Sequence, residues 1–218
     1  MTHLEVLPDA EALAARAAEV VEAAAEEAVA DRGIFHWAAS GGATPVPMFR
    51  RLALPWSGTG TFQVDERVAP EGDDDRNLTH LRRALPADAA TTLRPMPVEA
   101  DDLDSAATAY ERSLPERFDL VHLGIGDDGH TASLLPDDPV LDVRDRDVAL
   151  TGTFRGRRRM TLTYPVLDRA RRVLWIVAGS TKADALARLL AGDTSIPAGR
   201  VMAADQLVLA DADAAPRA

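Results

Sequence analysis

The sequence contains no cysteine among its 218 residues, and aromatic residues make up only 5% of it. The absence of cysteine excludes disulfides, thiolate metal sites and thiol nucleophiles. No apolar run approaches the ~20 residues that cross a membrane. Residues 1–5 also lack the basic and apolar regions of a signal peptide. We therefore expect a cytoplasmic protein that has no membrane partner.

Positive charge is also scarce, because 24 Lys and Arg residues stand against 35 Asp and Glu residues and leave a formal net charge of −11. Lys182 is the only lysine. Nucleic acids bind proteins that present a positive face, so we expect no nucleic-acid partner. The cluster Arg155, Arg157, Arg158 and Arg159 is short, and it predicts a local anion site or a salt-bridged loop. The sequence does not decide which of these four arginines reaches a ligand.

Helical and strand patterns alternate along the chain. With 46% hydrophobic residues the chain can bury one sizeable core, so we expect a single domain over residues 1–218. Helices are predicted over residues 9–31, 45–54, 75–84, 101–114, 165–170 and 179–191. Strands are predicted over residues 34–39, 61–64, 92–96, 148–153, 160–163 and 173–178, in a run that begins at 118, and near 201 and 207–209. This alternation predicts a doubly wound α/β fold with a mostly parallel sheet and helices on both faces.

The stretch 118–136 carries the clearest chemistry. A short apolar run is followed by two glycines, two aspartates and His130. In an open parallel sheet, ligands bind beyond the carboxyl ends of the strands, and histidine is the side chain that ordinarily titrates near neutral pH. Turn geometry alone also explains Gly and Asp at such a position. His130 therefore carries the functional interpretation.

Three further strand ends hold polar residues. Ser40 to Pro45 is a glycine-containing turn that opens a predicted helix, and this arrangement turns backbone N–H groups toward an anion. A plain glycine turn would explain the same residues, and the stretch matches neither the dinucleotide nor the P-loop motif. The second strand end is Asp65-Glu66-Arg67. The third is Gly179 to Lys182, which places Lys182 in the first turn of a predicted helix.

Five motifs in this order resemble those of the 6-phosphogluconolactonase family, over nearly the whole chain. They are Ser40 to Pro45, Asp65 to Arg67, Gly124 to Ser133, Arg159 to Thr163 and Gly179 to Lys182. The resemblance implies a Rossmann-like fold, shared with glucosamine-6-phosphate deaminases and ribose-5-phosphate isomerases. It also implies no metal or cofactor and a sugar-phosphate substrate: hydrolysis of 6-phospho-D-glucono-1,5-lactone to 6-phosphogluconate in the pentose phosphate pathway. Arg76, where many relatives have Ser, and Asp137-Asp138 depart from the family pattern.

Ester hydrolysis needs a base for water, a group that stabilises the oxyanion, and a grip on the substrate. In this interpretation His130 is the base, Asp65 orients His130 or the sugar hydroxyls, and Arg67 stabilises the oxyanion or the carboxylate. The predicted substrate- and phosphate-binding residues are Ser40, Gly41, Gly42, Thr44, Asp128, Gly129, Arg159 and Lys182. His122 lies within a strand and is predicted to belong to the core or to an interstrand contact.

Two alternatives stay open at this point. A glucosamine-6-phosphate deaminase would carry a catalytic Glu where this chain has Leu135, and a tyrosine where it has Arg67. A sugar-phosphate-sensing domain that does not catalyse would normally accompany a DNA-binding segment, and no basic helix-turn-helix candidate is found. The sequence leaves the oligomeric state open between a monomer and a weak dimer.

Overall fold

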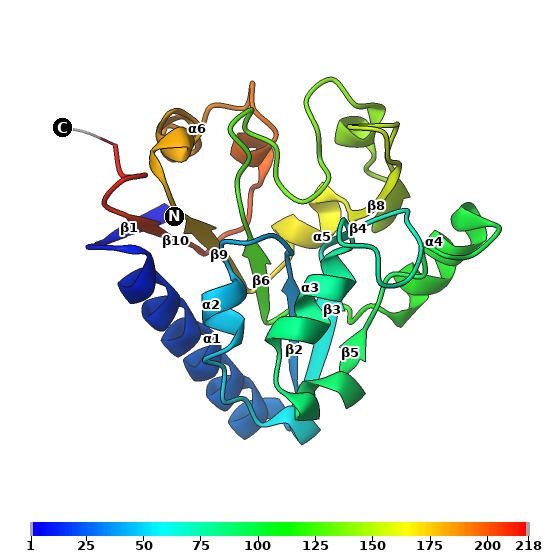
Figure 1. The fold of residues 1–218 in the computed structure, drawn as a ribbon, viewed down its shortest axis with the longest axis horizontal. Coiled ribbons are helices and arrows are strands. Elements are labelled where there is room, and N and C mark those ends of the chain that lie inside the picture. Colours follow the sequence, from blue (N-terminus) through cyan, green and yellow to red (C-terminus); the bar gives the residue numbers. More distant parts are fainter. Residues whose placement is uncertain (1, 217–218) are drawn as a thin grey trace.

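The computed structural model of the protein describes residues 2–216. The central strands are β1 Thr2–Leu7, β2 Phe35–Ala39, β3 Thr59–Gln63, β5 Leu93–Arg94, β6 Leu120–Leu123, β9 Arg172–Val177 and β10 Gln206–Asp211. They form one seven-stranded sheet in the order β1-β10-β9-β6-β2-β3-β5, and every pairing in it is parallel (Figure 1). The predicted parallel α/β sheet is confirmed.

Helices cover both faces of this sheet. Their bounds are α1 Ala10–Arg32, α2 Val46–Phe49, α3 Asn77–Ala84, α4 Leu103–Ser113, α5 Tyr164–Asp168 and α6 Ala183–Leu190. Successive side chains of a strand point to opposite faces. In β9, Leu174 and Ile176 belong to the core under α1, α2 and α3, whereas Trp175 belongs to the core that contains α4, α5 and α6. The doubly wound arrangement is therefore confirmed as well.

The first helix begins and ends where its sequence predicts. The Asp9 side chain caps α1 by accepting a hydrogen bond from the Ala12 backbone N–H at 2.8 Å. Gly33 ends the helix with a φ of 75°, a left-handed conformation that glycine adopts without steric cost. The buried side of the helix is mostly alanine and valine, which lets it lie close to the sheet.

A second, three-stranded antiparallel sheet was not expected from the sequence. It consists of β4 Asp65–Arg67, β8 Arg159–Leu162 and β7 Val148–Leu150, in the order β4-β8-β7. The charged triplet at 65–67 is therefore a strand and not only the end of one. Such a short strand of charged residues has no hydrophobic alternation that would indicate a strand. Its central residue, Glu66, is fully buried, and its carboxylate accepts hydrogen bonds from the backbone N–H groups of Asn77 and Leu78.

Three smaller expectations were wrong, and one strand was missed. The missed strand is the edge strand β1, in which no side chain is fully buried. The helix expected over 45–54 is only α2, which ends at Phe49. The helix expected from 179 begins as a 3-10 turn, Ser180–Lys182, so Lys182 precedes α6. Residue 201 lies outside any strand.

The order of strands places a crevice beside β2. After β2 the chain adds β3 and β5 on one side, and it then returns to add β6, β9 and β10 on the other side. Parallel sheets bind ligands where the strand order reverses in this way, beyond the carboxyl ends of the strands. The turn after β2 begins at Ser40, and the loop after β6 begins at Gly124. These two predicted motifs therefore meet at one crevice.

Candidate active site

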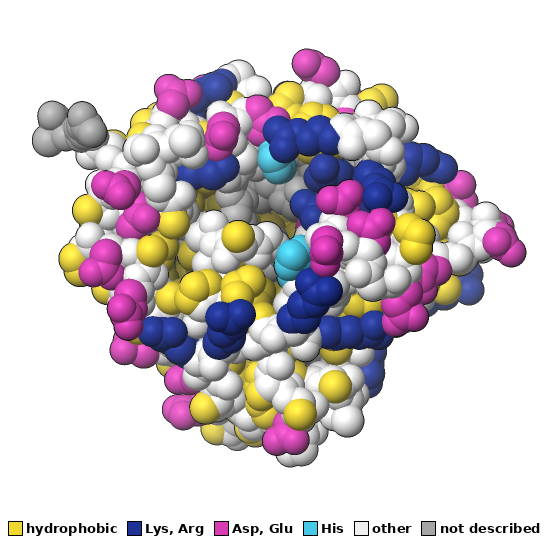
Figure 2. Space-filling view, in the orientation of Figure 1, with side chains coloured by type: hydrophobic (Ala, Val, Ile, Leu, Met, Phe, Trp, Pro, Cys, Tyr) yellow, Lys and Arg dark blue, Asp and Glu magenta, His cyan; other side chains and the backbone are white. Residues whose placement is uncertain are grey.

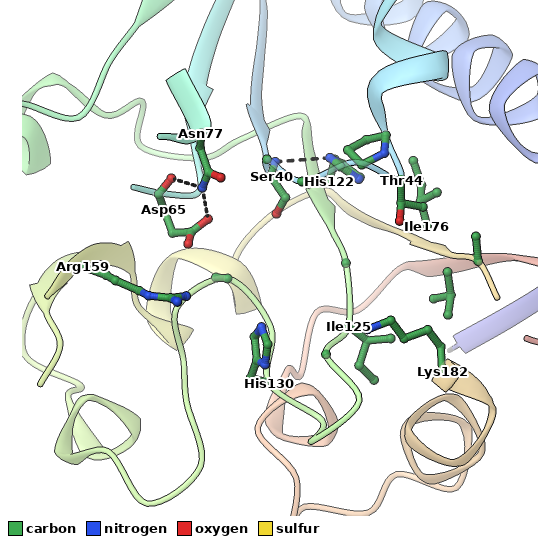
Figure 3. A pocket seen from close by; sticks show the side chains of 18 of the residues that line it. Ser40, Thr44, Asp65, Asn77, His122, Ile125, His130, Arg159, Ile176 and Lys182 are labelled. Carbon is green, nitrogen blue, oxygen red and sulfur yellow. Dashed lines mark hydrogen bonds between the residues drawn. The ribbon is translucent and has the colours of Figure 1, made fainter. Parts of the chain in front are cut away.

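A cavity of about 210 Å³ opens at the carboxyl ends of β2, β6 and β9. Figure 2 shows this face of the molecule hollowed, with Lys and Arg side chains along the rim. Nine of the predicted site residues line the cavity: Ser40, Gly41, Gly42, Thr44, Asp65, Arg67, His130, Arg159 and Lys182. In Figure 3, the side chains of His130, Arg159 and Lys182 extend from different segments toward a common space. The remaining two predicted residues, Asp128 and Gly129, do not line the cavity.

His130 is held by the aspartate two residues before it. Its Nδ1 lies 2.5 Å from Oδ1 of Asp128, and its backbone N–H donates to the same oxygen at 3.1 Å. A Cβ at Gly126 would lie 2.1 Å from Nδ1 of His130, so only glycine leaves room for the ring at this position. Gly129 has a φ of 80° and turns the loop between the two side chains. The Asp-Gly-His motif is thus a device that fixes an imidazole.

The ionisation of Asp128 sets the tautomer of His130. Burial raises the pKa of Asp128, but hydrogen bonds and the charge of His130 outweigh this effect and leave that pKa below its ordinary value. An ionised carboxylate accepts hydrogen bonds only, so Nδ1 of His130 must donate. Nε2 is then the nitrogen left free to accept a proton.

Two arginines face each other across the second sheet. Arg67 of β4 and Arg159 of β8 are paired residues in the antiparallel register, and both line the cavity. Like charges directly opposite each other destabilise a sheet. Burial, followed by the neighbouring charge of Arg67, lowers the pKa of Arg159. Two cations placed together at such a cost indicate a site for an anion or for developing negative charge.

Unpartnered polar atoms gather in the cavity. Within residues 2–216, the buried side-chain atoms without a hydrogen-bond partner are Ser40 Oγ, Arg67 Nε, Arg76 Nε, Asn77 Oδ1 and Arg159 Nε. Four of these five belong to residues that line the cavity. The fifth, Arg76 Nε, is 3.1 Å from Glu66 Oε2 in an ion pair. Buried polar groups are normally paired, so this concentration points to a polar ligand.

Asp65 is engaged away from His130. Its Oδ2 accepts a hydrogen bond from Ser133 Oγ at 2.5 Å, and its Oδ1 accepts one from Asn77 Nδ2 at 3.0 Å. Arg159 Nη1 donates to the same Ser133 hydroxyl at 3.4 Å. Asp65 was expected to orient either His130 or the sugar hydroxyls. In the structure the carboxylate that contacts His130 is that of Asp128. Asp65 stays available for contact with sugar hydroxyls.

The glycine turn after β2 lies against two residues whose role the sequence did not reveal. A Cβ at Gly41 would lie 2.1 Å from Asn77 Oδ1, so glycine is required where the turn approaches α3. The Ser40 backbone N–H donates to Nδ1 of His122 at 3.2 Å. Burial lowers the pKa of His122 to about 3, which keeps its ring neutral and able to accept that bond. The expectation that His122 is a core residue is confirmed, and it also holds the turn.

Lys182 lines the cavity on the side opposite Arg159 (Figure 3). It precedes α6, and its ammonium group forms an ion pair with Asp127, a residue of the loop after β6. α2, which was expected to present its N-terminus to an anion, is only four residues long. The positive charge on this side therefore comes from Lys182 and the turn N–H groups more than from a long helix.

The two departures from the family pattern have structural explanations. Arg76 is buried, forms ion pairs with Glu66 and Glu99, and donates to the Ala69 carbonyl at 2.8 Å. Asp137 adopts a φ of 61° at a turn, and Asp138 accepts a hydrogen bond from the Gly152 backbone N–H at 2.9 Å. None of these three residues lines the cavity.

The chain is similar in sequence to known proteins over most of its length. The sequence model of the family described as glucosamine-6-phosphate isomerases/6-phosphogluconolactonase matches residues 8–209. A 6-phosphogluconolactonase from Synechocystis is 37% identical over 208 residues, which cover 87% of this chain and 85% of the relative. One from Mycobacterium bovis is 36% identical, with coverage of 99% and 98%. The chain belongs to this family.

Solved structures agree with this family assignment. The crystal structure of the 6-phosphogluconolactonase from Thermotoga maritima is 26% identical, covers 97% of this chain and 99% of its own, and superimposes with a TM-score of 0.86. A monomeric glucosamine-6-phosphate deaminase shares the fold with a TM-score of 0.83 at 21% identity. The fold of the glucosamine-6-phosphate isomerase/6-phosphogluconolactonase family thus serves both activities. The site residues must therefore distinguish them.

Within residues 2–216, no helix is long and apolar enough to cross a membrane. Within the same residues, no group of three His, Cys, Asp or Glu side chains could hold a metal ion. The cytoplasmic location expected from the sequence stays a prediction, as does the oligomeric state.

Proposed function

We propose that the protein hydrolyses 6-phospho-D-glucono-1,5-lactone to 6-phosphogluconate, the lactonase step of the pentose phosphate pathway. The observation that carries the proposal is an imidazole fixed by Asp128 next to two facing arginines with unpartnered Nε atoms. Family membership supports the same reaction, since three relatives with 36–38% identity are 6-phosphogluconolactonases. The site combines a base, positive charge for an oxyanion, and an anion grip.

The chemical step uses Nε2 of His130 as the general base. Nε2 takes a proton from water while the water oxygen attacks C1 of the lactone, and the carbonyl electrons move onto its oxygen. The Arg67 guanidinium stabilises that oxyanion, and Arg159 adds a second positive charge beside it. As the carbonyl re-forms, the bond between C1 and the ring oxygen breaks. The imidazolium returns its proton to the ring oxygen, which becomes the 5-hydroxyl of the product.

The phosphate of the substrate occupies the other side of the cavity. The turn from Ser40 to Thr44 supplies backbone N–H groups and two hydroxyls, and Lys182 supplies a full positive charge. Charge-assisted hydrogen bonds to phosphate are about twice as strong as neutral ones. With the phosphate bound there, C1 of the sugar lies near His130 and the two arginines. The sugar hydroxyls then face the wall of the cavity that contains Asp65.

The decisive assay offers freshly generated 6-phosphogluconolactone and couples its hydrolysis to oxidation of 6-phosphogluconate. Glucosamine 6-phosphate serves as the control substrate. We expect rapid lactone hydrolysis and no release of ammonia, because Leu135 is buried and apolar where a deaminase needs an acid. Ammonia release would support deamination instead. Binding of 6-phosphogluconate without turnover of either compound would support a sensing domain.

Lactone hydrolysis is expected to continue undiminished in the presence of EDTA. The proposed base needs no metal to activate water, because Asp128 already orients it. The measurement is the initial rate before and after dialysis against the chelator, with the spontaneous hydrolysis of the lactone subtracted. Loss of activity that a divalent ion restores would contradict the mechanism.

Replacing Lys182 by alanine is expected to raise KM about 10- to 100-fold, the range that corresponds to one hydrogen bond to a charged group. The kcat should change much less, because Lys182 does not contact the reacting carbonyl in this arrangement. Competition by inorganic phosphate should weaken in parallel. The exposed Arg158→Ala variant is the control for loss of one positive charge. An unchanged KM in Lys182→Ala would mean that the phosphate binds elsewhere.

A further inference from the structure

The Lys182 ammonium group is not free in this structure. It forms an ion pair with an Asp127 carboxylate oxygen, to which Thr181 Oγ1 also donates a hydrogen bond at 3.4 Å. The Lys182 side chain is 26% exposed and lines the cavity, whereas the Asp127 side chain is 64% exposed and lies outside the lining. The pair therefore spans the rim of the cavity, with its cation inside and its carboxylate in solvent.

Asp127 is charged under the conditions in which a phosphate would bind. The hydrogen bond from Lys182 lowers the pKa of Asp127 below its ordinary value, and the small effect of burial does not offset this. Asp128, the next residue, is bound to His130 and makes no ion pair with Lys182. The two neighbouring aspartates thus have separate partners, one at the base and one at the lysine.

We infer that Asp127 is a built-in competitor for Lys182, which a ligand must displace before it gains from the lysine. The inference rests on the proposed function, in which Lys182 binds the phosphate of the substrate. A phosphate monoester carries about −1.5 to −2 charges at pH 7, whereas a carboxylate carries only one. Exchange of Asp127 for a phosphate therefore increases the charge that faces Lys182, and exchange for a carboxylate does not.

The consequence is a general loss of affinity at Lys182. Every anion that binds the lysine must first displace Asp127, so the ion pair weakens the binding of substrate, product and inorganic phosphate by the same factor. Removal of the Asp127 charge should therefore strengthen the binding of each of them.

The test is the Asp127→Asn variant, which keeps the shape of the side chain and removes its charge. We expect KM for the lactone and the inhibition constant of inorganic phosphate each to fall about two- to fivefold, the range set by exposed ion pairs, with kcat unchanged. Asp184→Asn is the matched control. This exposed aspartate lies two residues after Lys182, and its carboxylate has no hydrogen bond or ion pair within the described part of the chain. Its KM should match that of the wild type.

The double variant Asp127→Asn/Lys182→Ala tests whether the effect of Asp127 on KM depends on Lys182. If Asp127 acts by occupying Lys182, the gain in affinity seen in Asp127→Asn should disappear once Lys182 is alanine. An equal gain in both backgrounds would indicate long-range repulsion and would overturn the inference. A higher KM in Asp127→Asn would also overturn it, because Asp127 would then position Lys182 for the ligand. An unchanged KM in Lys182→Ala alone would instead contradict the phosphate site of the proposed function.

Discussion

Replacing His130 by asparagine is expected to lower kcat by roughly 10²- to 10⁴-fold, the usual contribution of general-base catalysis. Asparagine keeps a polar side chain near Asp128 but cannot accept a proton from water. Binding should survive, because the proposed phosphate contacts lie on the far side of the cavity at Ser40 to Thr44 and Lys182. The measurements are kcat in the coupled assay and the affinity for 6-phosphogluconate by calorimetry.

The control for this substitution is His3→Asn, which removes an exposed imidazole on β1. It should behave as the wild type. The spontaneous hydrolysis of the lactone must be subtracted, since the variant is expected to approach that background. A folded His130→Asn protein that binds 6-phosphogluconate normally and keeps a near wild-type kcat would remove His130 from the chemistry. Asp65 or Asp128 would then be the base to examine.

Replacing Arg67 by glutamine is expected to lower kcat by about 10²- to 10³-fold, the loss typical of removing one group that stabilises an oxyanion. Glutamine retains a hydrogen-bond donor but not the positive charge. KM should change less than kcat, because the oxyanion exists in the transition state and not in the bound lactone. Steady-state kinetics on the purified variant separate the two constants.

Arg158→Gln is the matched control for Arg67→Gln. Arg158 is exposed and directly precedes Arg159 in the sequence. Its substitution therefore removes one positive charge outside the cavity. Arg67 also donates to the Asp75 carbonyl at 2.6 Å, and a thermal melt must therefore show that its variant remains folded. A folded Arg67→Gln enzyme with unchanged kcat and raised KM would assign Arg67 to substrate binding and leave Arg159 as the oxyanion group.

Local sequence patterns predicted the residues that gather at the sheet. The Asp-Gly-His motif and the Ser-Gly-Gly turn each follow an apolar strand, and strand periodicity is visible within a few residues. Parallel pairing then brings strand ends to one edge whatever the distance between them in the chain. This is why Ser40 and His130 could be assigned to one site before their contacts were known.

The contacts between these residues could not be predicted in the same way. Which carboxylate reaches His130 depends on the glycines at 126 and 129, which fold the loop so that Asp128 is nearer than Asp65. The pairing of Arg67 with Arg159 depends on an antiparallel register between segments about ninety residues apart. No pattern in the sequence indicated a role for Asn77 beyond its position at the start of a helix. Its role arises from the approach of Gly41.

The parallel pairing of β1 with β10 links the beginning of the chain to its end. β1 is an edge strand, and β10 is its neighbour in the central sheet. During synthesis, the backbone N–H and C=O groups of β1 that pair with β10 therefore find these partners only after residues 206–211 have left the ribosome. Contacts between such distant segments close late in folding, because the entropy of a long loop is lost before they contribute. The central strands can pair earlier, so we expect this edge of the sheet to be completed after its centre.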